Sequence, residues 1–407
     1  MQQYLLEDFR AFLAASPTSW HAVKEIGNRL AEKEFIPLAL GEPWALEKGK
    51  RYFVARGGSL CAFALPKTAV KKAVILATHT DSPALKIKPQ PQVNEENMVL
   101  LEVETYGAPL LTSWMNRDLA IAGRVVTKGG EEKLVFFDDA PLFIPQLAIH
   151  LDREVNEKGL VLNKQEHLRP IAAVGKYPAY LEHLFKQKLL SFDLFLVPIE
   201  APRYLGPTSE MLASYRLDNL ASAHAALTAI AQAKPSDQLQ VALFSDHEEI
   251  GSRSAEGAGS TFLADVLKRL EIPEKEWARV PSESLCVSID VAHAFNPNYA
   301  NRYDPNHHPL IGKGIVLKYN ADHKYTTNAP TAARVLQACD KLSLPHQNFA
   351  CRSDMPCGST VGPILSSGLG IPAVDIGCPI FSMHSAREVM GVQDHLDMCK
   401  LLTQLLQ

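Results

Sequence analysis

The sequence lacks the cysteine patterns that mark disulfide-rich or thiolate-metal proteins. Its seven cysteines are odd in number, are scattered along the chain and include no CxxC pair. This distribution argues against both a disulfide framework and a thiolate metal site. Reduced thiols in the cytoplasm are the simplest explanation, so we expect a cytoplasmic protein.

The sequence also lacks a charge bias, a long apolar run and internal repeats. A net charge of −4 provides no basic face, so we expect neither a nucleic-acid partner nor a membrane surface as partner. No apolar run approaches the roughly 18 residues that span a bilayer. Near the N-terminus, Glu7, Asp8 and Arg10 interrupt the apolar residues, which predicts a helix and not a signal peptide.

What the sequence does have is enough apolar material for a large core. Of its 407 residues, 46% are hydrophobic and 21% are charged, as in ordinary globular proteins. The segment 3–31 predicts two amphipathic helices that Pro17 separates, with Thr18 or Ser19 able to cap the second.

A change in pattern predicts two kinds of structure along the chain. Between about 90 and 207, short runs rich in Val, Leu and Thr alternate with turn signals such as Gly129–Gly130, which indicates antiparallel β-structure. On either side, apolar strands alternate with helices, which indicates an α/β layer with a largely parallel sheet. We therefore expect a discontinuous α/β domain, 1–90 and 208–407, interrupted by a mainly β insertion, 91–207. The strands expected in the α/β domain are 59–65, 73–78, 240–244, 285–289, 315–317 and 371–376, and its helices include 219–233 and 330–342.

Two short motifs carry isolated polar residues beside predicted elements. His79 and Asp81 directly follow the strand VILAT, and residues two apart in extended backbone project to the same side. Asp81 could therefore orient the imidazole of a metal-binding His79, although a polar turn after a strand has the same sequence. Asp218 opens a predicted helix and is a candidate ligand, but an N-cap role explains it equally well.

The segment 244–252 is more specific because it places three carboxylates within a stretch of four residues directly after a strand expected to be buried: Asp246, Glu248 and Glu249. Crowded carboxylates raise one another's pKa, and a cation removes that penalty. One glutamate can then bind metal while its neighbour accepts a proton from water. The HExxH zinc motif is absent because position 251 is glycine. A solvated acidic loop is the alternative.

Two further strands end beside possible ligands, Asp290 after LCVSI and His384 after IPAVDIG. Together with the earlier motifs, the order His, Asp, Glu-Glu, Asp, His makes coincidence a poor explanation. Five ligands with Asp218 shared between two ions give each ion three protein ligands, which leaves a catalytic position open. Such a two-metal site suits the hydrolysis of an amide.

These motifs give the sequence a resemblance to a known family. Over nearly its whole length the chain resembles the aspartyl aminopeptidase family of metallo-aminopeptidases. The motifs that carry the resemblance are HTDSPALKIKP (79–89), IPQLAIHL (144–151), RLDNLASAHA (216–225), SDHEEIGS (245–252), SIDVAHAFNPNY (288–299), NHHPLIGKGIVLKYN (306–320), SDMPCGSTVGPIL (353–365) and MHSAREVM (383–390).

The resemblance implies a role for each candidate residue. His79 and Asp290 would bind one divalent metal ion and Glu249 and His384 a second, with Asp218 bridging. Zinc would be the usual ion, with cobalt or manganese as possible substitutes. Asp81 would orient His79, and Glu248 would be the general base that activates water against an N-terminal peptide bond.

The resemblance also implies a fold, an assembly and a substrate class. The fold would be a zinc-exopeptidase-type mixed sheet flanked by helices, with the insertion as a dimerisation domain. Dimers would assemble as a homo-oligomer, a tetrahedral dodecamer, and the partners would be peptides with acidic N-terminal residues, Asp or Glu. Residues that the resemblance links to substrate are His150 from a neighbouring subunit, His293, Lys318 and Tyr325.

Several alternatives stay open at the level of sequence. His150 lies in the apolar run AIHL and could be a core histidine, and Lys318 could be a solvated lysine after a strand. Tyr215, Gln146 and the segment 325–328 depart from the usual family pattern, which leaves room for broad or neutral specificity. A related carboxypeptidase or deacylase is the nearest alternative enzyme, and a non-catalytic scaffold or vesicle cargo is the alternative outside enzymes.

Overall fold

The computed structural model describes residues 2–270, 272–273, 275 and 279–407. Within these residues the alternating strands and helices build one nine-stranded mixed sheet, whose four neighbouring strands β13, β4, β14 and β18 run parallel. In sheet order the strands are β1 (Ile36–Leu38), β2 (Arg51–Arg56), β3 (Ser59–Ala64), β13 (Leu239–Ser245), β4 (Ala73–His79), β14 (Leu285–Ile289), β18 (Ala373–Gly377), β16 (Ile315–Tyr319) and β17 (His346–Ala350).

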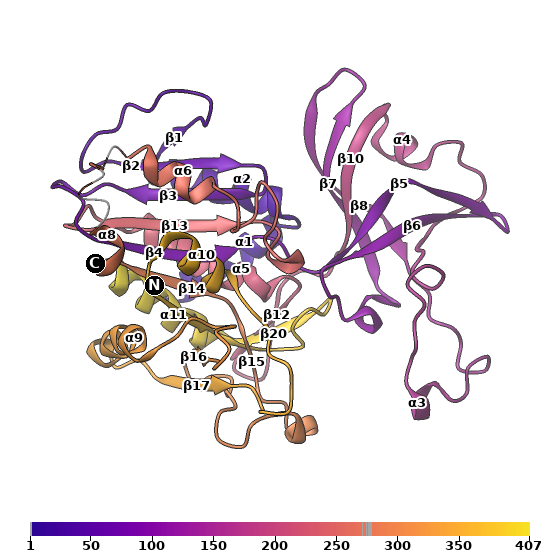
Figure 1. Ribbon diagram of the computed structural model, residues 1–407. Helices are drawn as coiled ribbons and strands as arrows, with labels where there is room; N and C mark the ends of the chain where they lie inside the picture. Colours follow the sequence, from indigo (N-terminus) through magenta and orange to yellow (C-terminus); the bar gives the residue numbers. More distant parts are fainter. Residues whose placement is uncertain (1, 271, 274, 276–278) are drawn as a thin grey trace. The chain divides into compact units, whose positions relative to one another are not determined.

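Both faces of this sheet are covered by helices, and the strands are accordingly apolar on both sides. Alternate strand residues point to opposite faces: Leu60 and Leu76 belong to one apolar cluster, while Cys61 and Ala77 belong to the other. Helices α5 and α10 lie on opposite faces (Figure 1). One face packs against α1 (Gln2–Ala15), α2 (Ser19–Glu32), α5 (Leu217–Ala231), α9 (Ala329–Leu342) and α11 (Val392–Leu406); the other packs against α6 (Phe262–Lys268), α8 (Val280–Glu283) and α10 (Val361–Leu369).

A small second sheet accompanies the large one, and the sequence did not predict it. Its strands have two to four residues, too few to show a periodic pattern. In order they are β11 (Arg203–Leu205), β12 (Met211–Ser214), β20 (Glu388–Gly391), β19 (Pro379–Phe381) and β15 (Ala292–His293). Short 3₁₀ helices are η1 (Leu111–Trp114), η2 (Glu248–Ile250) and η3 (Pro297–Arg302).

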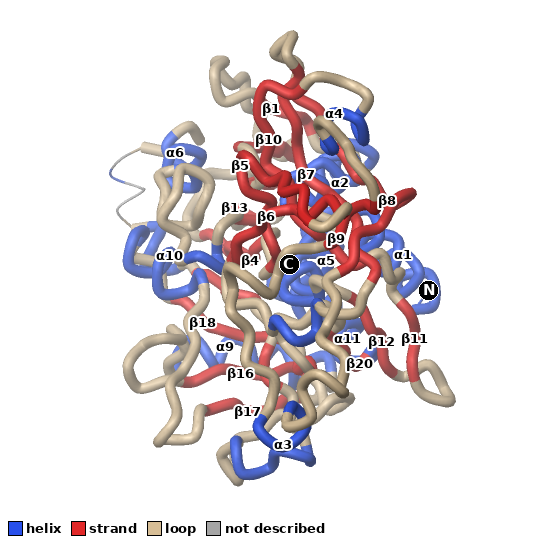
Figure 2. Tube along the Cα trace, turned by 90° about the vertical axis from the view of Figure 1, so that its right-hand side faces the viewer, coloured by secondary structure: helices blue, strands red, loops and turns tan. Residues whose placement is uncertain are grey.

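The segment between these α/β parts closes into a six-stranded barrel (Figure 2). Antiparallel pairing continues around it, and the indole of Trp114 is fully buried. Gly123 has a φ of +152°, and a side chain there would collide with the carbonyl of Asp193 on the neighbouring strand. In order the strands are β10 (Leu189–Pro198), β5 (Ala84–Glu95), β6 (Met98–Tyr106), β9 (Ile171–Val174), β8 (Glu132–Phe143) and β7 (Asp118–Thr127), with the short helices α3 (Val155–Lys158) and α4 (Tyr180–Phe185) in the connections.

The chain thus divides into two units, each with its own contacts. The first comprises Met1–Asp81, Pro202–Met383 and Glu388–Gln407, and the second Ser82–Ala201 and His384–Arg387. The α/β fold with a mixed sheet, flanking helices and a mainly β second part is confirmed. The domain boundaries and the dimerisation role taken from the resemblance stay predictions. Among the described residues, no helix combines the length and apolar character that crossing a membrane requires.

Candidate metal centre

Three adjacent parallel strands end at one edge of the large sheet, and the predicted ligands follow them. His79 is the last residue of β4, Glu248 and Glu249 lie just beyond β13, and Asp290 directly follows β14. Carboxyl ends of neighbouring parallel strands share a sheet edge, where functional groups collect in α/β folds. Asp218 reaches the same place from the start of α5.

The distances between these side chains are those of a single cluster. His79 Nε2 lies 3.4 Å from Asp218 Oδ1, 3.6 Å from Asp290 Oδ1 and 4.0 Å from Glu248 Oε2. His79, Asp218 and Glu249 each offer one ligand atom within 4.8 Å of the others. A set of one imidazole and several carboxylates at this spacing matches the nitrogen and oxygen donors that zinc accepts.

Asp81 connects the histidine to the glutamate loop. Its carboxylate oxygens accept hydrogen bonds from the backbone N–H groups of Glu248 and Glu249, each at 3.1 Å. His79 Nδ1 lies 3.1 Å from the Asp81 carbonyl oxygen and 3.4 Å from the Asp81 carboxylate. A proton on Nδ1 leaves Nε2 as the nitrogen that can bind metal. Asp81 therefore does more than the predicted orientation of one ring.

The backbone beside these residues takes up left-handed conformations that side chains usually avoid. Arg216, two residues before Asp218, has a φ of 66°, and His247, just before Glu248, has a φ of 62°. Such conformations cost free energy and persist only where the surrounding structure enforces them. They are found most often at functional sites. Helix α5 has Arg216 at its cap position, but Asp218 also has an extended backbone, so the N-cap explanation for Asp218 stays open. The solvated-loop explanation fails, because Asp246 is 1% exposed.

Two residues that support the cluster were missed by the sequence analysis. Glu388 is buried and accepts a hydrogen bond from the backbone N–H of Asp218 at 3.0 Å. Asn219 is buried and donates its side-chain amide to the carbonyl of Ile289 at 2.8 Å, which ties the start of α5 to the end of β14. Asn219 lies in the motif RLDNL and Glu388 in MHSAREVM. The motifs were recognised, but nothing in them indicated what these two residues do.

The electrostatics of the cluster show an excess of negative charge. Burial raises the pKa of Glu248 to about 8, and Asp290, Asp81 and Asp218 add to the effect while His79 opposes it. Burial and the neighbouring Asp218 also hold the pKa of Glu249 well above its usual range. Burial alone lowers the pKa of His79, but Asp218, Asp290 and Asp81 together hold it well above normal. The residues therefore fit a bound cation, which relieves this repulsion.

Comparison with known proteins places this chain in a family. Residues 12–405 match the family described as aminopeptidase I zinc metalloprotease (M18). The chain belongs to the M18 family. It is 42% identical over 420 residues to a probable M18 family aminopeptidase 2 of Streptomyces avermitilis, an alignment that covers 98% of this chain and 97% of that relative.

Solved structures of M18 proteins share the fold. An M18 aminopeptidase from Thermotoga maritima has a TM-score of 0.90 at 25% identity, with 100% of this chain and 96% of that one covered. The dodecamer of mApe1 from S. cerevisiae has a TM-score of 0.84 at 26% identity, with 99% and 96% covered. The protein is therefore a metallo-aminopeptidase of the M18 family, and the predicted family is confirmed.

Three of the residues expected to contact substrate lie in the first unit, which also contains the cluster around His79. Lys318 is 2% exposed, donates to the carbonyl of Val291 at 3.2 Å and lies 3.8 Å from Asp290 Oδ2. Its ammonium is 5.0 Å from the ring centroid of Tyr325. The solvated-lysine alternative is therefore wrong. Tyr325 is buried, which raises the pKa of its hydroxyl, and His293 is exposed with its ring against Phe349.

Two predicted residues belong to the second unit. His384 has a φ of 67°, is half-buried, and its Nδ1 lies 3.1 Å from the carbonyl oxygen of Ala108. His150 is exposed in a turn, so the core-histidine alternative is wrong. The metal-binding role of His384 and the substrate role of His150 stay predictions.

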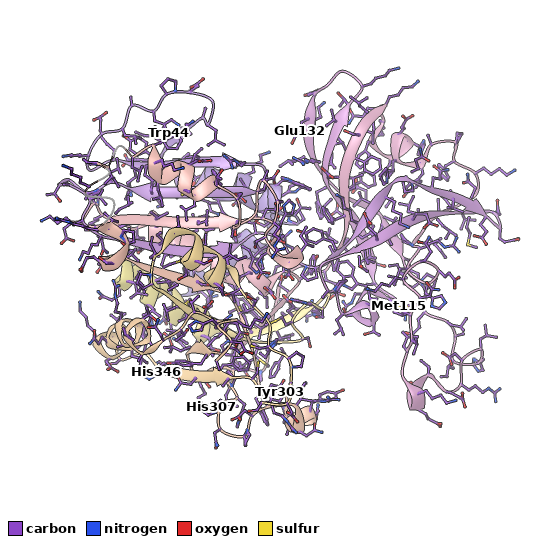
Figure 3. The ribbon with its side chains drawn as sticks, viewed as in Figure 1. Trp44, Met115, Glu132, Tyr303, His307 and His346 are labelled. Atoms are coloured by element: carbon purple, nitrogen blue, oxygen red, sulfur yellow. The ribbon has the colours of Figure 1, made fainter. Side chains whose placement is uncertain are left out.

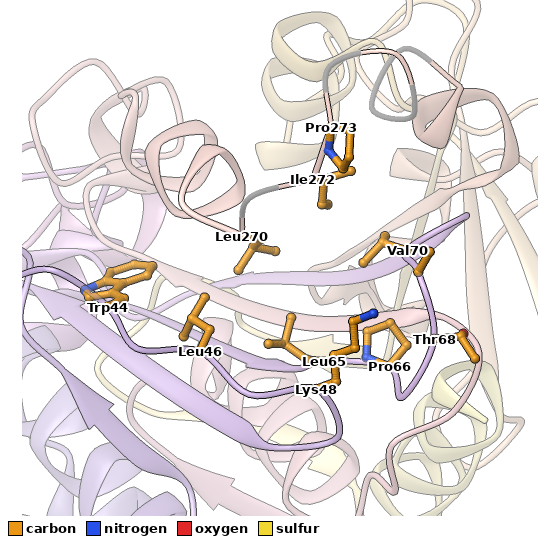
Figure 4. A pocket seen from close by; sticks show the side chains of 11 residues that line it. Trp44, Leu46, Lys48, Leu65, Pro66, Thr68, Val70, Leu270, Ile272 and Pro273 are labelled. Carbon is orange, nitrogen blue, oxygen red and sulfur yellow. The ribbon is translucent and has the colours of Figure 1, made fainter.

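A pocket of about 350 Å³ elsewhere in the first unit contains none of these groups (Figure 4). Trp44, Leu46, Leu65, Val70 and Leu270 are among its lining residues. A substrate site needs a few convergent polar groups in addition to an apolar lining. The predicted polar groups converge at the sheet edge and are absent from this pocket.

Proposed function

We propose that the chain is a dinuclear aminopeptidase that removes N-terminal residues from peptides and favours Asp and Glu. The observation that carries the proposal is the convergence of His79, Asp218, Glu249, Asp290 and Glu248 at one sheet edge. One imidazole and four carboxylates form a strongly anionic site, which matches two divalent cations better than one.

The ligand assignment follows from the resemblance, and the short distances from His79 to Asp218 and Asp290 support part of it. His79 and Asp290 hold one ion, Glu249 and His384 hold the other, and Asp218 is shared. Zinc is the expected ion, with cobalt or manganese able to substitute. When bound, such ions lower the pKa of water and polarise a carbonyl.

Glu248 is the general base in the proposed reaction. Its carboxylate lies beside the cluster, with Oε2 4.0 Å from His79 Nε2, and the resemblance assigns it no metal ion. It takes a proton from the attacking water and returns it to the amine that leaves. The backbone N–H groups of Glu248 and Glu249 donate to the Asp81 carboxylate and hold the loop in place. The loop that carries the Glu248 carboxylate is therefore positioned before the reaction begins, which avoids an entropic cost.

The functional test is a kinetic series of amide substrates with different N-terminal residues. We expect kcat/KM for free N-terminal Asp and Glu to exceed the values for Leu, Ala and Lys by about tenfold or more. N-acetylated Asp serves as the control and should not be cleaved. Equal rates across the series would favour a broad-specificity aminopeptidase, and cleavage of blocked substrates would favour the related carboxypeptidase or deacylase.

Lys318 is the residue proposed to select acidic substrates. A buried ammonium attracts a substrate carboxylate that is itself shielded from water, so we expect Lys318→Met to lower kcat/KM for Asp and Glu by about 30-fold or more. Values for Leu and Ala should change by less than about threefold. Lys324→Met, which alters an exposed lysine nearby, is the matched control.

The contact between Lys318 and Asp290 gives this experiment a second readout. Metal content should be measured in the same preparation, because loss of the ammonium alters the surroundings of a proposed ligand. A uniform loss across all substrates together with loss of metal would show damage to the centre and contradict a role in selection.

A homo-oligomer is the proposed assembly, with dimers building a tetrahedral dodecamer. The second unit exposes large apolar side chains around His150: Leu147 is 57% exposed, Leu151 74% and Val161 84%. Apolar side chains gathered on a surface mark interaction sites. An exposed His150 on this loop is free to reach a neighbouring subunit, as its proposed role requires.

A further inference from the structure

Two of the seven cysteines have surroundings unlike those of the other five. The five are buried, and burial raises the pKa of each of their thiols, so they are poor nucleophiles. Cys351 and Cys357 are instead half-buried, so solvent and small oxidants can reach them. The five buried cysteines are Cys61, Cys286, Cys339, Cys378 and Cys399.

The chain brings these two thiols together in a tight loop. Strand β17 begins at His346, labelled in Figure 3, and ends one residue before Cys351. In the loop to Cys357, the Arg352 side chain donates to Asp354 at 2.6 Å, and the backbone N–H of Met355 donates to the carbonyl of Arg352 at 2.9 Å. Both thiols pack against the same four-residue apolar cluster, and each is the largest influence on the other's pKa, so the two side chains are neighbours.

The loop lies against the residues proposed to select substrate. Both cysteines pack against the small apolar cluster that contains Tyr325 and Phe349. Tyr325 is close enough to Cys357 to lower the pKa of its thiol. The neighbouring Cys351 lowers the pKa of Cys357 most, and Tyr325 and the charge of Lys318 lower it further. Burial opposes these effects, and the resulting pKa is about 6. A thiolate that is accessible and has a second thiol beside it is the arrangement found in redox-sensitive pairs.

We propose that Cys351 and Cys357 are a modification site at which a peroxide forms a reversible disulfide. The Cys357 thiolate attacks one peroxide oxygen, the O–O bond breaks, and hydroxide leaves to give Cys357 sulfenic acid. The Cys351 sulfur then attacks the Cys357 sulfur, the S–O bond breaks, and the Cys351 proton departs with the oxygen as water. The two sulfurs are oxidised by two electrons in total and the peroxide is reduced; a dithiol reverses the change.

The disulfide has a consequence for catalysis that rests on the proposed function. The charge of Lys318 lowers the pKa of the Cys357 thiol, so a Cys357 thiolate in the reduced chain would compete with a substrate carboxylate for that charge. The disulfide carries no charge, so oxidation removes that competitor. We expect KM for N-terminal Asp to fall about threefold on oxidation, with KM for N-terminal Leu unchanged.

The first test measures the bond itself and needs no enzymatic activity. The metal-loaded chain is treated with a small excess of hydrogen peroxide, its remaining thiols are alkylated, and it is digested with trypsin without reduction. Cleavage after Arg352 places the two cysteines on separate peptides, so a disulfide joins them into one mass that dithiothreitol separates. Titratable thiols should fall from seven to five.

Variants decide whether this pair is the site. Cys351→Ser and Cys357→Ser should both abolish the joined peptides, and Cys351→Ser should leave a sulfenic acid on Cys357 that dimedone traps. Cys339→Ala alters a buried thiol on α9 and should leave the disulfide unchanged. Seven thiols remaining after peroxide, or oxidation of Cys339 as fast as Cys357, overturns the proposal. A disulfide without a selective change in KM overturns only its link to the substrate pocket.

Discussion

Glu248→Gln should keep its metal ions and lose nearly all of its turnover. The amide has the shape of the carboxylate but cannot accept the proton of water, and removal of a general base lowers rates by about 10²–10⁴-fold. Metal content should not fall, because Glu248 is not among the five proposed ligands. The measurements are kcat on an N-terminal Asp substrate and metal per chain by mass spectrometry.

The control for this variant is Glu256→Gln, the same replacement in the same loop region. Glu256 accepts a hydrogen bond from the backbone N–H of Gly58, and an amide oxygen can accept that bond as well. Glu256→Gln should therefore retain wild-type turnover. Near-native kcat in Glu248→Gln would reject Glu248 as the base and move that role to another carboxylate of the cluster, Asp290 or Glu249.

The proposed ligands on strand ends could be predicted because sheet geometry alone brings them together. His79, Glu249 and Asp290 follow three apolar runs, and parallel pairing of those runs carries their ends to one edge. The sequence shows the runs and the polar residues after them. The pairing order was not needed, since every parallel neighbour ends on the same side.

Residues whose position depends on single backbone conformations could not be placed in the same way. Asp218 reaches the cluster because Arg216 is left-handed and because Glu388, far away in sequence, accepts from its backbone N–H. Neither condition leaves a periodic signal. The burial of Lys318 could not be predicted for a different reason. A lysine inside an apolar strand can be buried only if partners compensate its charge, as the Asp290 carboxylate and the Val291 carbonyl do here.

Asp218→Ala should abolish binding of both metal ions, because Asp218 is proposed to be shared between them. We expect metal per chain to fall from about two to well below one, and activity to fall by about 10³-fold or more. Asp290→Ala removes a ligand from only one ion, so it should retain about one metal per chain. Equal loss of metal in the two variants would contradict the shared role of Asp218.

Stability distinguishes loss of a ligand from loss of the fold. Without metal, Asp218 adds negative charge to a site where carboxylates already raise the pKa of Glu248 and Glu249. Chelator-treated Asp218→Ala should therefore melt no lower than chelator-treated wild type, and Asp237→Ala, which alters an exposed aspartate, should match wild type throughout. Zinc at about 100 times its Kd should stabilise the wild type by about 2.7 kcal/mol and restore its activity. The same zinc should do neither for Asp218→Ala, since the ligand that joins the two ions is missing.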